Sequence, residues 1–267
     1  MAVICSSGNE RLRWVRRLAE SRKARRREGL WVAEGVRLAE ELVARGLPVR
    51  LWLVEEGWGR EGGRAGTLRS RVEQGGAPLL EVRRGLLCQI ADTQHPQGIL
   101  AVFEAPRWRE GDVLGGSGPV VILDRLQDPG NLGTIARTAE AAGAAGLLLL
   151  PGTADPGNPK ALRASAGSLL RLPVARAGES GEPWRRGGRR VLAAAGRGGI
   201  PYDRLDLAEP FALVLGQEGS GVSPALLARA DQLVTVPMEG AVESLNVAAT
   251  AAAILFEAAR QRRQKTP

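Results

Sequence analysis

Hydrophobic and polar positions follow two different periods along this chain. In the second half, short apolar runs that fit buried strands alternate with stretches of helical spacing, and the connections between them are short. Such regular alternation is typical of a parallel sheet covered by helices on both faces. The strands are expected at 120–123, 146–150, 173–177, 190–195, 211–215 and 233–236. Helices are expected at 132–142 and 159–168, and an alanine-rich helix follows the last strand.

The N-terminal part mixes the same two periods in a less regular order. Apolar residues at helical spacing predict helices over 10–28, 36–44, 68–74 and 84–91. Apolar runs predict strands at 30–33, 49–54, 79–82 and 99–103. The polar, glycine-rich stretch from Pro106 to Pro119 is typical of a linker. We therefore expect an α/β protein with a smaller domain over 1–106, a linker over 107–118 and a larger domain over 119–267.

The charge of the chain is concentrated near its start. The formal net charge is +8, and residues 11–27 contain nine Lys and Arg side chains against one acid, Glu20. A basic patch of this kind is typical of a protein that binds a polyanion, because each neutralised phosphate releases counterions. The alternative is a solubilising face or terminal arm.

Several classes of function are disfavoured by composition. Two cysteines are too few for a disulfide framework or a thiolate metal site, and His95 is the only histidine. A histidine-based triad or histidine-rich metal site is therefore excluded, and we expect no metal. No signal-peptide core is present, and no apolar run approaches the ~18 residues of a membrane span. We expect a cytoplasmic protein with no membrane contact.

Three loops at strand ends contain the residues that suggest chemistry. In the first, LDRLQDPGNLG, Asn131 is expected at the N-cap of a helix and Arg137 lies two turns into that helix. In the second, GQEGSG, Glu218 is a lone carboxylate among glycines, and Arg137 is its expected partner. In the third, VPMEGAVESLN, either Ser244 or Asn246 is expected to cap the final helix.

Each of these loops alone also fits an ordinary turn, cap or solvated side chain. The first is neither a P-loop nor a dinucleotide fingerprint, because it lacks both G-K-S/T and G-x-G-x-x-G. Their combination is far more specific. D-x-x-x-D-P-x-N-x-G-x-x-x-R-T-A, L-G-x-E-G-x-G and P-M-x-G-x-x-x-S-L-N occur in this order at the ends of strands of one domain.

With these motifs the sequence resembles the SpoU (TrmH-like) ribose methyltransferases of the SPOUT superfamily. The segments GLWVAEGVRLAEEL (29–42) and QGILAVF (97–103) resemble the L30e-like substrate-binding domain common in that family. The resemblance implies a C-terminal trefoil knot and transfer of a methyl group from S-adenosylmethionine to a ribose 2′-hydroxyl of RNA. It also implies a homodimer that forms through the C-terminal domain. Relatives with the L30e-like domain mostly act on large-subunit ribosomal RNA, so 23S rRNA is favoured over tRNA, and guanosine over other nucleotides.

The resemblance also implies which residues form the site. The expected catalytic residues are Asn131, Arg137, Glu218, Ser244 and Asn246. The expected cofactor-binding residues are Leu215, Gly216, Val236, Met238, Leu245, Ala195 and Gly196. The expected RNA contacts are Arg22, Arg25, Arg26, Arg27, Lys160 and Arg163.

The family proposal gives proton removal to Arg137, assisted by the RNA phosphate. An arginine has a pKa above ~12 and is a poor base, so our hypothesis is that Arg137 holds the phosphate and polarises the hydroxyl while Glu218 orients it. Two alternatives remain open from the sequence. One is a tRNA 2′-O-methyltransferase, and the other is a non-catalytic RNA-binding protein on the same fold.

Overall fold

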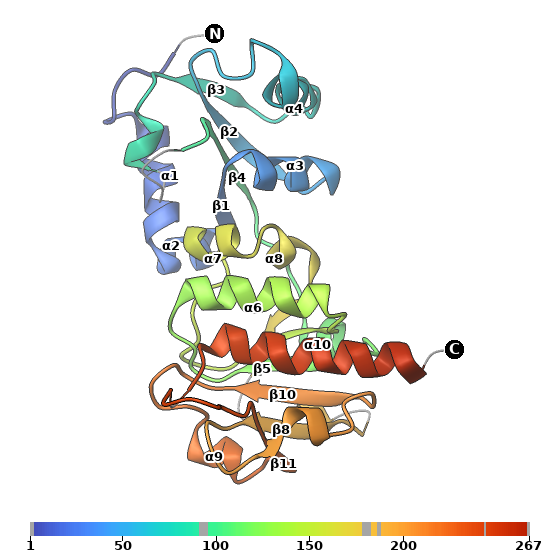
Figure 1. Cartoon of the computed structure of the whole chain (residues 1–267). Coiled ribbons are helices and arrows are strands. Elements are labelled where there is room, and N and C mark those ends of the chain that lie inside the picture. The colour runs from blue at the N-terminus through green and yellow to red at the C-terminus, as the bar shows by residue number, and fades with distance from the viewer. Residues whose placement is uncertain (1–2, 91–95, 178–182, 186–187, 243, 266–267) are drawn as a thin grey trace. The chain divides into compact units, whose positions relative to one another are not determined.

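The computed structural model describes residues 3–90, 96–177, 183–185, 188–242 and 244–265. The chain forms two compact units (Figure 1). The first contains Met1–Pro106 and Asp155–Leu170, and the second contains Arg107–Ala154 and Arg171–Pro267. The segment 155–170, which we placed in the C-terminal domain from the sequence, groups with the first unit.

The first unit is built on a four-stranded mixed sheet in the order β1-β4-β2-β3. The strands are β1 (Leu30–Glu34), β2 (Val49–Glu55), β3 (Leu79–Val82) and β4 (Ile99–Glu104). β4 pairs antiparallel with β1 and β2, whereas β2 and β3 are parallel. β1 is therefore an edge strand.

Helices pack on both faces of this sheet. α1 (Glu10–Glu20) buries Leu12, Val15 and Leu18 in a core formed with one face of the strands. The helices α3 (Val36–Ala44) and α4 (Gly63–Gln74) pack together, and their buried residues lie outside that core. They therefore cover the opposite face. The short helix α7 (Pro159–Ala164) packs against the edge strand β1.

Three expectations for the first unit are corrected by the structure. The single helix expected over 10–28 is broken at Ser21, whose extended backbone ends α1 and whose hydroxyl accepts from Ala24 N to begin α2 (Arg22–Glu28). The helix expected over 84–91 is reduced to the 3₁₀ turn η1 (Leu87–Gln89), because Gly85 adopts a positive φ of 81°; Ala91 lies outside the described residues. α4 begins five residues earlier than expected.

The second unit is a seven-stranded parallel sheet in the order β7-β6-β5-β10-β8-β11-β9. Its strands are β5 (Val120–Leu123), β6 (Gly146–Leu149), β7 (Val174–Arg176), β8 (Arg190–Ala194), β9 (Ile200–Pro201), β10 (Phe211–Leu215) and β11 (Gln232–Thr235). The expected parallel α/β fold is thus confirmed, with β9 as an additional short strand. The order places β10 between β5 and β8, and β11 follows on the far side of β8.

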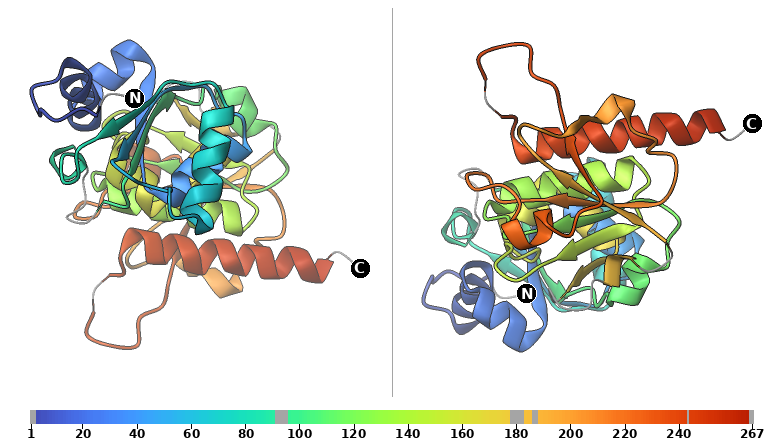
Figure 2. Two further views of the ribbon diagram at one scale, coloured as in Figure 1. Left: turned by 90° about the horizontal axis from the view of Figure 1, so that it is seen from above. Right: turned by 90° about the horizontal axis from the view of Figure 1, so that it is seen from below.

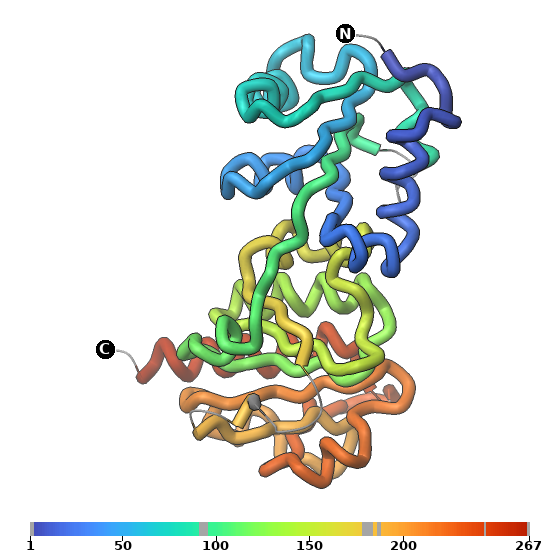
Figure 3. Tube along the Cα trace, turned by 180° about the vertical axis from the view of Figure 1, so that it is seen from behind, coloured from blue at the N-terminus to red at the C-terminus, as the bar shows by residue number. Residues whose placement is uncertain are grey.

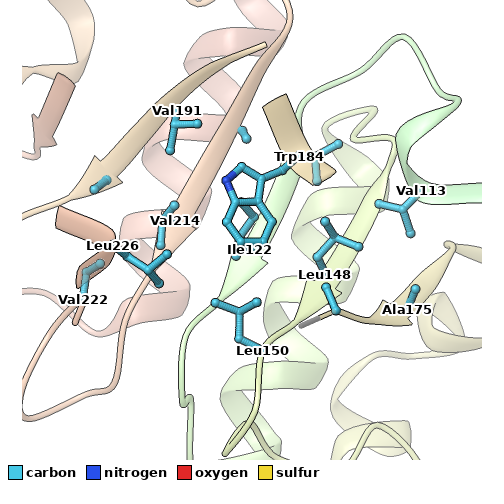
Figure 4. Close-up of a cluster of buried hydrophobic side chains, with 14 residues drawn as sticks. Val113, Ile122, Leu148, Leu150, Ala175, Trp184, Val191, Val214, Val222 and Leu226 are labelled. Carbon is cyan, nitrogen blue, oxygen red and sulfur yellow. The ribbon is translucent and has the colours of Figure 1, made fainter. Parts of the chain in front are cut away.

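Both faces of this sheet are covered. α6 (Pro129–Ala141) and α10 (Val247–Lys265) pack together on one face (Figure 1). On the other face, Val113 of α5 (Glu110–Leu114), Trp184 of the 3₁₀ turn η2 (Pro183–Arg185) and Leu226 of α9 (Pro224–Leu227) pack against strand residues such as Ile122 and Val214 (Figure 4). The sheet is buried on both sides, as expected for parallel strands.

Two connections differ from the sequence expectation. The presumed linker contains α5, whose start is capped by Asp112 accepting from Arg109 N at 2.7 Å. The helix expected over 159–168 is divided into α7 and α8 (Ser168–Arg171), because Ala166 and Gly167 adopt positive φ angles of 48° and 95°.

Among the described residues, no helix combines the length and hydrophobicity that a membrane span requires.

Candidate active site

The three motif loops converge at the carboxyl edge of the parallel sheet in the second unit. The first follows β5, the second follows β10 and the third follows β11. The third loop extends away from the rest of the unit before it enters α10 (Figure 2). Ligands of open α/β sheets bind at this edge, where helix N-termini and free backbone groups are exposed.

Glu218 in the second loop binds the first loop through three hydrogen bonds. Asn131 Nδ2 and Asp128 N donate to its Oε1 at 3.0 and 3.2 Å, and Gln127 N donates to its Oε2 at 3.3 Å. Burial alone would raise the pKa of Glu218, but the hydrogen bonds from Asn131 and from backbone amides outweigh it, so the pKa is lowered. The carboxylate is therefore ionised at neutral pH and acts as an acceptor.

Asn131 continues this connection to the third loop. Its Oδ1 accepts from Asn246 Nδ2 at 3.1 Å, and Asn246 Oδ1 accepts from Ala248 N at 2.8 Å in the first turn of α10. The direction of the chain is fixed by chemistry, because an ionised carboxylate can only accept and a helix N-terminus can only donate. Both amide side chains must therefore take one orientation. We call Glu218, Asn131 and Asn246 the amide relay.

The structure assigns the helix caps more specifically than the sequence did. Asp128, not Asn131, is the N-cap of α6: its side chain accepts from Gly130 N at 3.1 Å, and Pro129 occupies the first helical position. Asn131 lies one turn inside, which leaves its amide available to the relay. Of the two candidates for the cap of α10, Asn246 provides it.

Arg137 does not bind Glu218, so our expectation of that pair is wrong. Its side chain is exposed and makes no hydrogen bond or ion pair within the described part of the chain. Arg137 lies six residues after Asn131 in α6, which corresponds to a rotation of roughly 240° and a rise of about 9 Å. The two side chains therefore leave the helix on different faces, and the guanidinium faces solvent.

Two residues of the first loop were given no role from the sequence. Asp124 is 1% exposed; its backbone N donates to Leu215 O at 2.9 Å, and its Oδ2 accepts from Ser223 N at 2.7 Å. It thereby fixes both ends of the second loop to β5. The D-x-x-x-D-P spacing contained this signal, since an acid at the end of a buried strand needs donors.

Gln127 was also missed, and its residue type gave no signal. Its Nε2 donates to Arg125 O at 2.7 Å and to Gly152 O at 2.9 Å. Arg125 adopts a left-handed φ of 57°, which is uncommon for a residue other than glycine. Gln127 thus holds a strained turn in place while its own backbone N binds Glu218.

A cavity of about 480 Å³ opens between the second and third loops and the end of β8. Its lining includes every residue expected to bind the cofactor: Leu215, Gly216, Val236, Met238, Leu245, Ala195 and Gly196. It also includes Glu218, Ser244 and Asn246, whereas Asn131 and Arg137 do not line it.

The geometry of the second loop explains its glycines. Gln217 and Gly221 exchange backbone hydrogen bonds, so the loop folds back on itself. A Cβ at Gly216 would lie 2.1 Å from backbone atoms of Gly221 and Val222. Only glycine fits at this position.

The cavity fits a nucleoside with a cationic sulfur substituent. Its volume is in the range of small-ligand sites, roughly 300–1,000 Å³. Leu215, Val236 and Met238 provide apolar walls for a planar base, and the ionised Glu218 provides negative charge for a cation. The residues present therefore fit S-adenosylmethionine.

The residues expected to bind RNA phosphate are not equivalent in the structure. Arg26, Arg27 and Lys160 are exposed, and Arg22 is partly exposed. Arg163 is 28% exposed and its Nη1 lies 3.3 Å from Glu34 Oε2. Arg25 is 3% exposed and its guanidinium is bound by Asp155 and two backbone carbonyls. A side chain so buried offers no surface to a phosphate, so the expectation needs correction at Arg25.

Comparison with known proteins places this fold and site in a defined class. Residues 118–256 match the model of the SpoU rRNA Methylase family, and residues 9–101 match the MRM3-like substrate binding domain. The 23S rRNA (guanosine(2553)-2′-O)-methyltransferase RlmP of Bacillus subtilis is 40% identical over 62% of this chain and 66% of that protein. The 23S rRNA (uridine(2479)-2′-O)-methyltransferase of Streptomyces viridochromogenes is 35% identical over 96% of this chain and 92% of that protein.

A solved structure resembles the whole chain. The AdoMet-bound rRNA methyltransferase from Sinorhizobium meliloti superposes with a TM-score of 0.84 at 30% identity, covering 100% of this chain and 99% of that one. Fold and site together define a methyltransferase of the SPOUT class with an appended substrate-binding domain. The chain belongs to the SpoU rRNA Methylase family. It is an RNA methyltransferase whose cofactor is S-adenosylmethionine.

Proposed function

We propose that this protein methylates a ribose 2′-hydroxyl of 23S rRNA, with guanosine the favoured nucleotide. The observation that carries the proposal is the amide relay, which joins the three motif loops beside a cavity that fits the cofactor. Two relatives act on 23S rRNA 2′-hydroxyls, one at a guanosine and one at a uridine. Both relatives support the RNA class and the ribose position, and the relative that acts on a guanosine supports the base.

The roles of the residues follow from their positions. S-adenosylmethionine, when bound, supplies a methyl group on a positively charged sulfur. Glu218, Asn131 and Asn246 fix the loops that hold it, because a hydrogen-bonded chain anchored to a helix N-terminus leaves little freedom at the reacting centre. Ser244 lines the cavity and is exposed, so its hydroxyl is available to the incoming ribose.

Arg137 provides the complementary function on the solvent side. Its guanidinium is exposed and uncommitted among the described residues, and a planar guanidinium binds phosphate with two parallel hydrogen bonds. We assign it to the phosphate next to the target ribose, where it also polarises the 2′-hydroxyl. Because arginine remains protonated in proteins, it is not the final proton acceptor.

The test is methyl transfer from labelled S-adenosylmethionine to deproteinised 23S rRNA and, separately, to tRNA, with product nucleosides identified by mass. We expect 2′-O-methylguanosine from 23S rRNA with the wild type and none with Arg137→Ala. Arg204→Ala is the matched control, since Arg204 is exposed and also has no side-chain partner among the described residues. Methylation of tRNA alone would overturn the substrate, and a methylated base would overturn the ribose assignment.

We also propose that the first unit (1–106 with 155–170) acts as an RNA-binding domain and that the second unit is a knotted catalytic domain that forms a homodimer. Exposed apolar side chains on and before α10 support the dimer: Leu245 and Phe256 are 40% and 48% exposed, and the exposed Ala249 lies two turns before Phe256 on the same face of α10. Phe256→Glu should convert the dimer to a monomer in sedimentation analysis. A monomeric wild type would exclude this assembly.

A further inference from the structure

The exposed half of α2 contains a concentration of positive charge. Lys23, Arg26 and Arg27 are exposed, while Ala24 and Arg25 face inward. Arg27 lies 3.1 Å from Glu28, whereas Lys23 and Arg26 make no side-chain hydrogen bond or ion pair in the described part of the chain. α2 therefore presents cations to solvent with little internal neutralisation.

The inward arginine ties this helix to its surroundings. Arg25 Nε donates to Asp155 Oδ2 at 2.8 Å, and Arg25 Nη1 donates to the carbonyls of Leu18 and Ala19 at 2.7 Å each. These carbonyls belong to the last turn of α1, where intrahelical partners are lacking. One guanidinium thus fixes α1, α2 and the segment 155–170 together.

Segment 155–170 has two further attachments within the first unit. Arg163 Nη1 lies 3.3 Å from Glu34 Oε2 at the end of β1. Gly157 is so close to Trp31 that a Cβ there would lie 2.3 Å from Trp31 Nε1. The segment is therefore held to α2 by the Arg25–Asp155 ion pair and to β1 by the Arg163–Glu34 ion pair, and Gly157 packs closely on Trp31 of β1 between them.

This attachment brings a second source of positive charge near α2. Lys160 is exposed at the start of α7, where Asn158 caps the helix by accepting from Lys160 N at 2.9 Å. It lies five residues after Asp155, so their Cα atoms are within about 17 Å of each other. Figures 1 and 3 show α2 beside α7. Arg26 of α2 and Lys160 of α7 are 134 residues apart in sequence, so the fold brings distant cations together.

We propose that Lys23, Arg26, Arg27 and Lys160 form one binding surface for the phosphate backbone of RNA, and that the buried Arg25–Asp155 pair positions it. A buried ion pair contributes little net stability compared with an apolar pair of the same shape. Its use here is consistent with a need for fixed geometry, because Arg25 joins three segments by directional bonds. The inference rests on the proposed function only in that RNA is the partner.

The test measures binding of a fluorescein-labelled RNA stem-loop of fixed sequence to the full chain at several salt concentrations, without cofactor. Each phosphate contact contributes about 0.7–0.9 to the slope of log affinity against log salt. We expect the slope to fall by about 2 for Lys23→Ala/Arg26→Ala, by about 1 for Lys160→Ala and by about 3 for the triple variant. The control is Arg71→Ala, which removes an exposed cation from α4 on the opposite face of the sheet and should leave the slope unchanged.

Asp155→Asn separates positioning from simple electrostatics. The substitution removes a negative charge, so electrostatics alone predicts tighter RNA binding. A positioning role predicts weaker binding, because Arg25 loses its charged partner and segment 155–170 loses an attachment. Far-UV circular dichroism and cofactor binding show whether Asp155→Asn folds; if it does not, the surface variants above still decide the proposal.

The outcomes distinguish this proposal from the function itself. Unchanged slopes in a protein that methylates RNA would overturn the surface and leave the function intact. An unchanged slope for Lys160→Ala alone would overturn the joint surface and confine binding to α2. Tighter binding by folded Asp155→Asn would overturn the positioning role. Absence of both RNA binding and methyl transfer in the wild type would contradict the proposed function.

Discussion

Asn246 Nδ2 lies 3.1 Å from Asn131 Oδ1, which joins the loop after β11 to the start of α6 across 115 residues of sequence. Asn131 in turn donates to Glu218, and Asn246 accepts from the first turn of α10. The residues thus form one directional chain between a carboxylate and a helix N-terminus. The loops that surround the cofactor cavity are fixed by this chain.

Asn246→Asp should separate the two functions of Asn246. Aspartate caps a helix as well as asparagine does, so α10 should keep its stability. The donor to Asn131 is lost, however, and Asn131 cannot rotate because Glu218 requires its NH₂ group. We expect methyl transfer to fall by about tenfold or more, as for the loss of about 1.4 kcal/mol, with an unchanged melting temperature. Asn246→Ala is the matched control, and losing the cap as well should destabilise it by about 0.5–2 kcal/mol. Full activity of Asn246→Asp would show that the relay is dispensable.

Glu218→Gln should weaken cofactor binding because an amide cannot replace the carboxylate here. One oxygen accepts from Asn131 and Asp128 and the other from Gln127 N. Glutamine must therefore direct its NH₂ group at a donor in either orientation. We expect the affinity for S-adenosylmethionine, measured by calorimetry, to fall by about tenfold.

The pH dependence of that difference follows from the lowered pKa of Glu218. The carboxylate therefore keeps its charge until pH falls below the ordinary range for glutamate, and once protonated it is neutral and carries a donor, as the glutamine amide does. The affinities of wild type and Glu218→Gln for S-adenosylmethionine should therefore differ by a constant factor at and above neutral pH. They should converge only in acid, below the ordinary range for glutamate. Convergence near pH 7 would mean that the carboxylate is not held ionised.

Asp124→Ala should destabilise the second unit. Removing this buried acceptor leaves Ser223 N without its 2.7 Å partner and frees the end of the second loop. The free energy of unfolding is expected to fall by about 1–3 kcal/mol, measured by urea unfolding. Asp124→Asn retains one acceptor oxygen for Ser223 N and should lose less. Equal losses for both variants would indicate that the charge of Asp124, and not this hydrogen bond, stabilises the loop.

Acid should remove a stabilising contact from α10. A hydrogen bond from Arg260 lowers the pKa of Glu257 to about 2, against an ordinary value of 4.5. The contribution of Glu257 is therefore complete above pH 4.5 and is lost as pH falls towards 2. The melting temperatures of wild type and Glu257→Gln should differ at neutral pH and converge as pH falls towards 2. A difference that persists unchanged at pH 2 would contradict this assignment.

Local patterns in the sequence were sufficient for elements that are defined by their own residues. Helix α3 begins and ends at the expected residues, Val36 and Ala44, because a buried apolar stripe lies between two glycines that punctuate it. The buried strand β10 was expected over the same residues, 211–215, for a similar reason. By contrast, the break at Ser21 depends on one residue that caps two helices, which a helical period does not reveal.

Contacts between distant segments account for the remaining differences. The motifs predict which loops meet. Charge and a shared sheet edge also predict Arg137 as the partner of Glu218, whereas rotation along α6 directs Arg137 elsewhere. Arg25 was counted with its exposed neighbours, since nothing local indicates a partner at Asp155. Pairing of this kind is determined by tertiary structure.

The most direct test of the account is one digestion of 23S rRNA after reaction with labelled S-adenosylmethionine, comparing wild type with Asn246→Asp. The account predicts labelled 2′-O-methylguanosine from the wild type and at least about tenfold less from a variant of unchanged melting temperature. Label in a base, or equal 2′-O-methylation by both proteins, would contradict it.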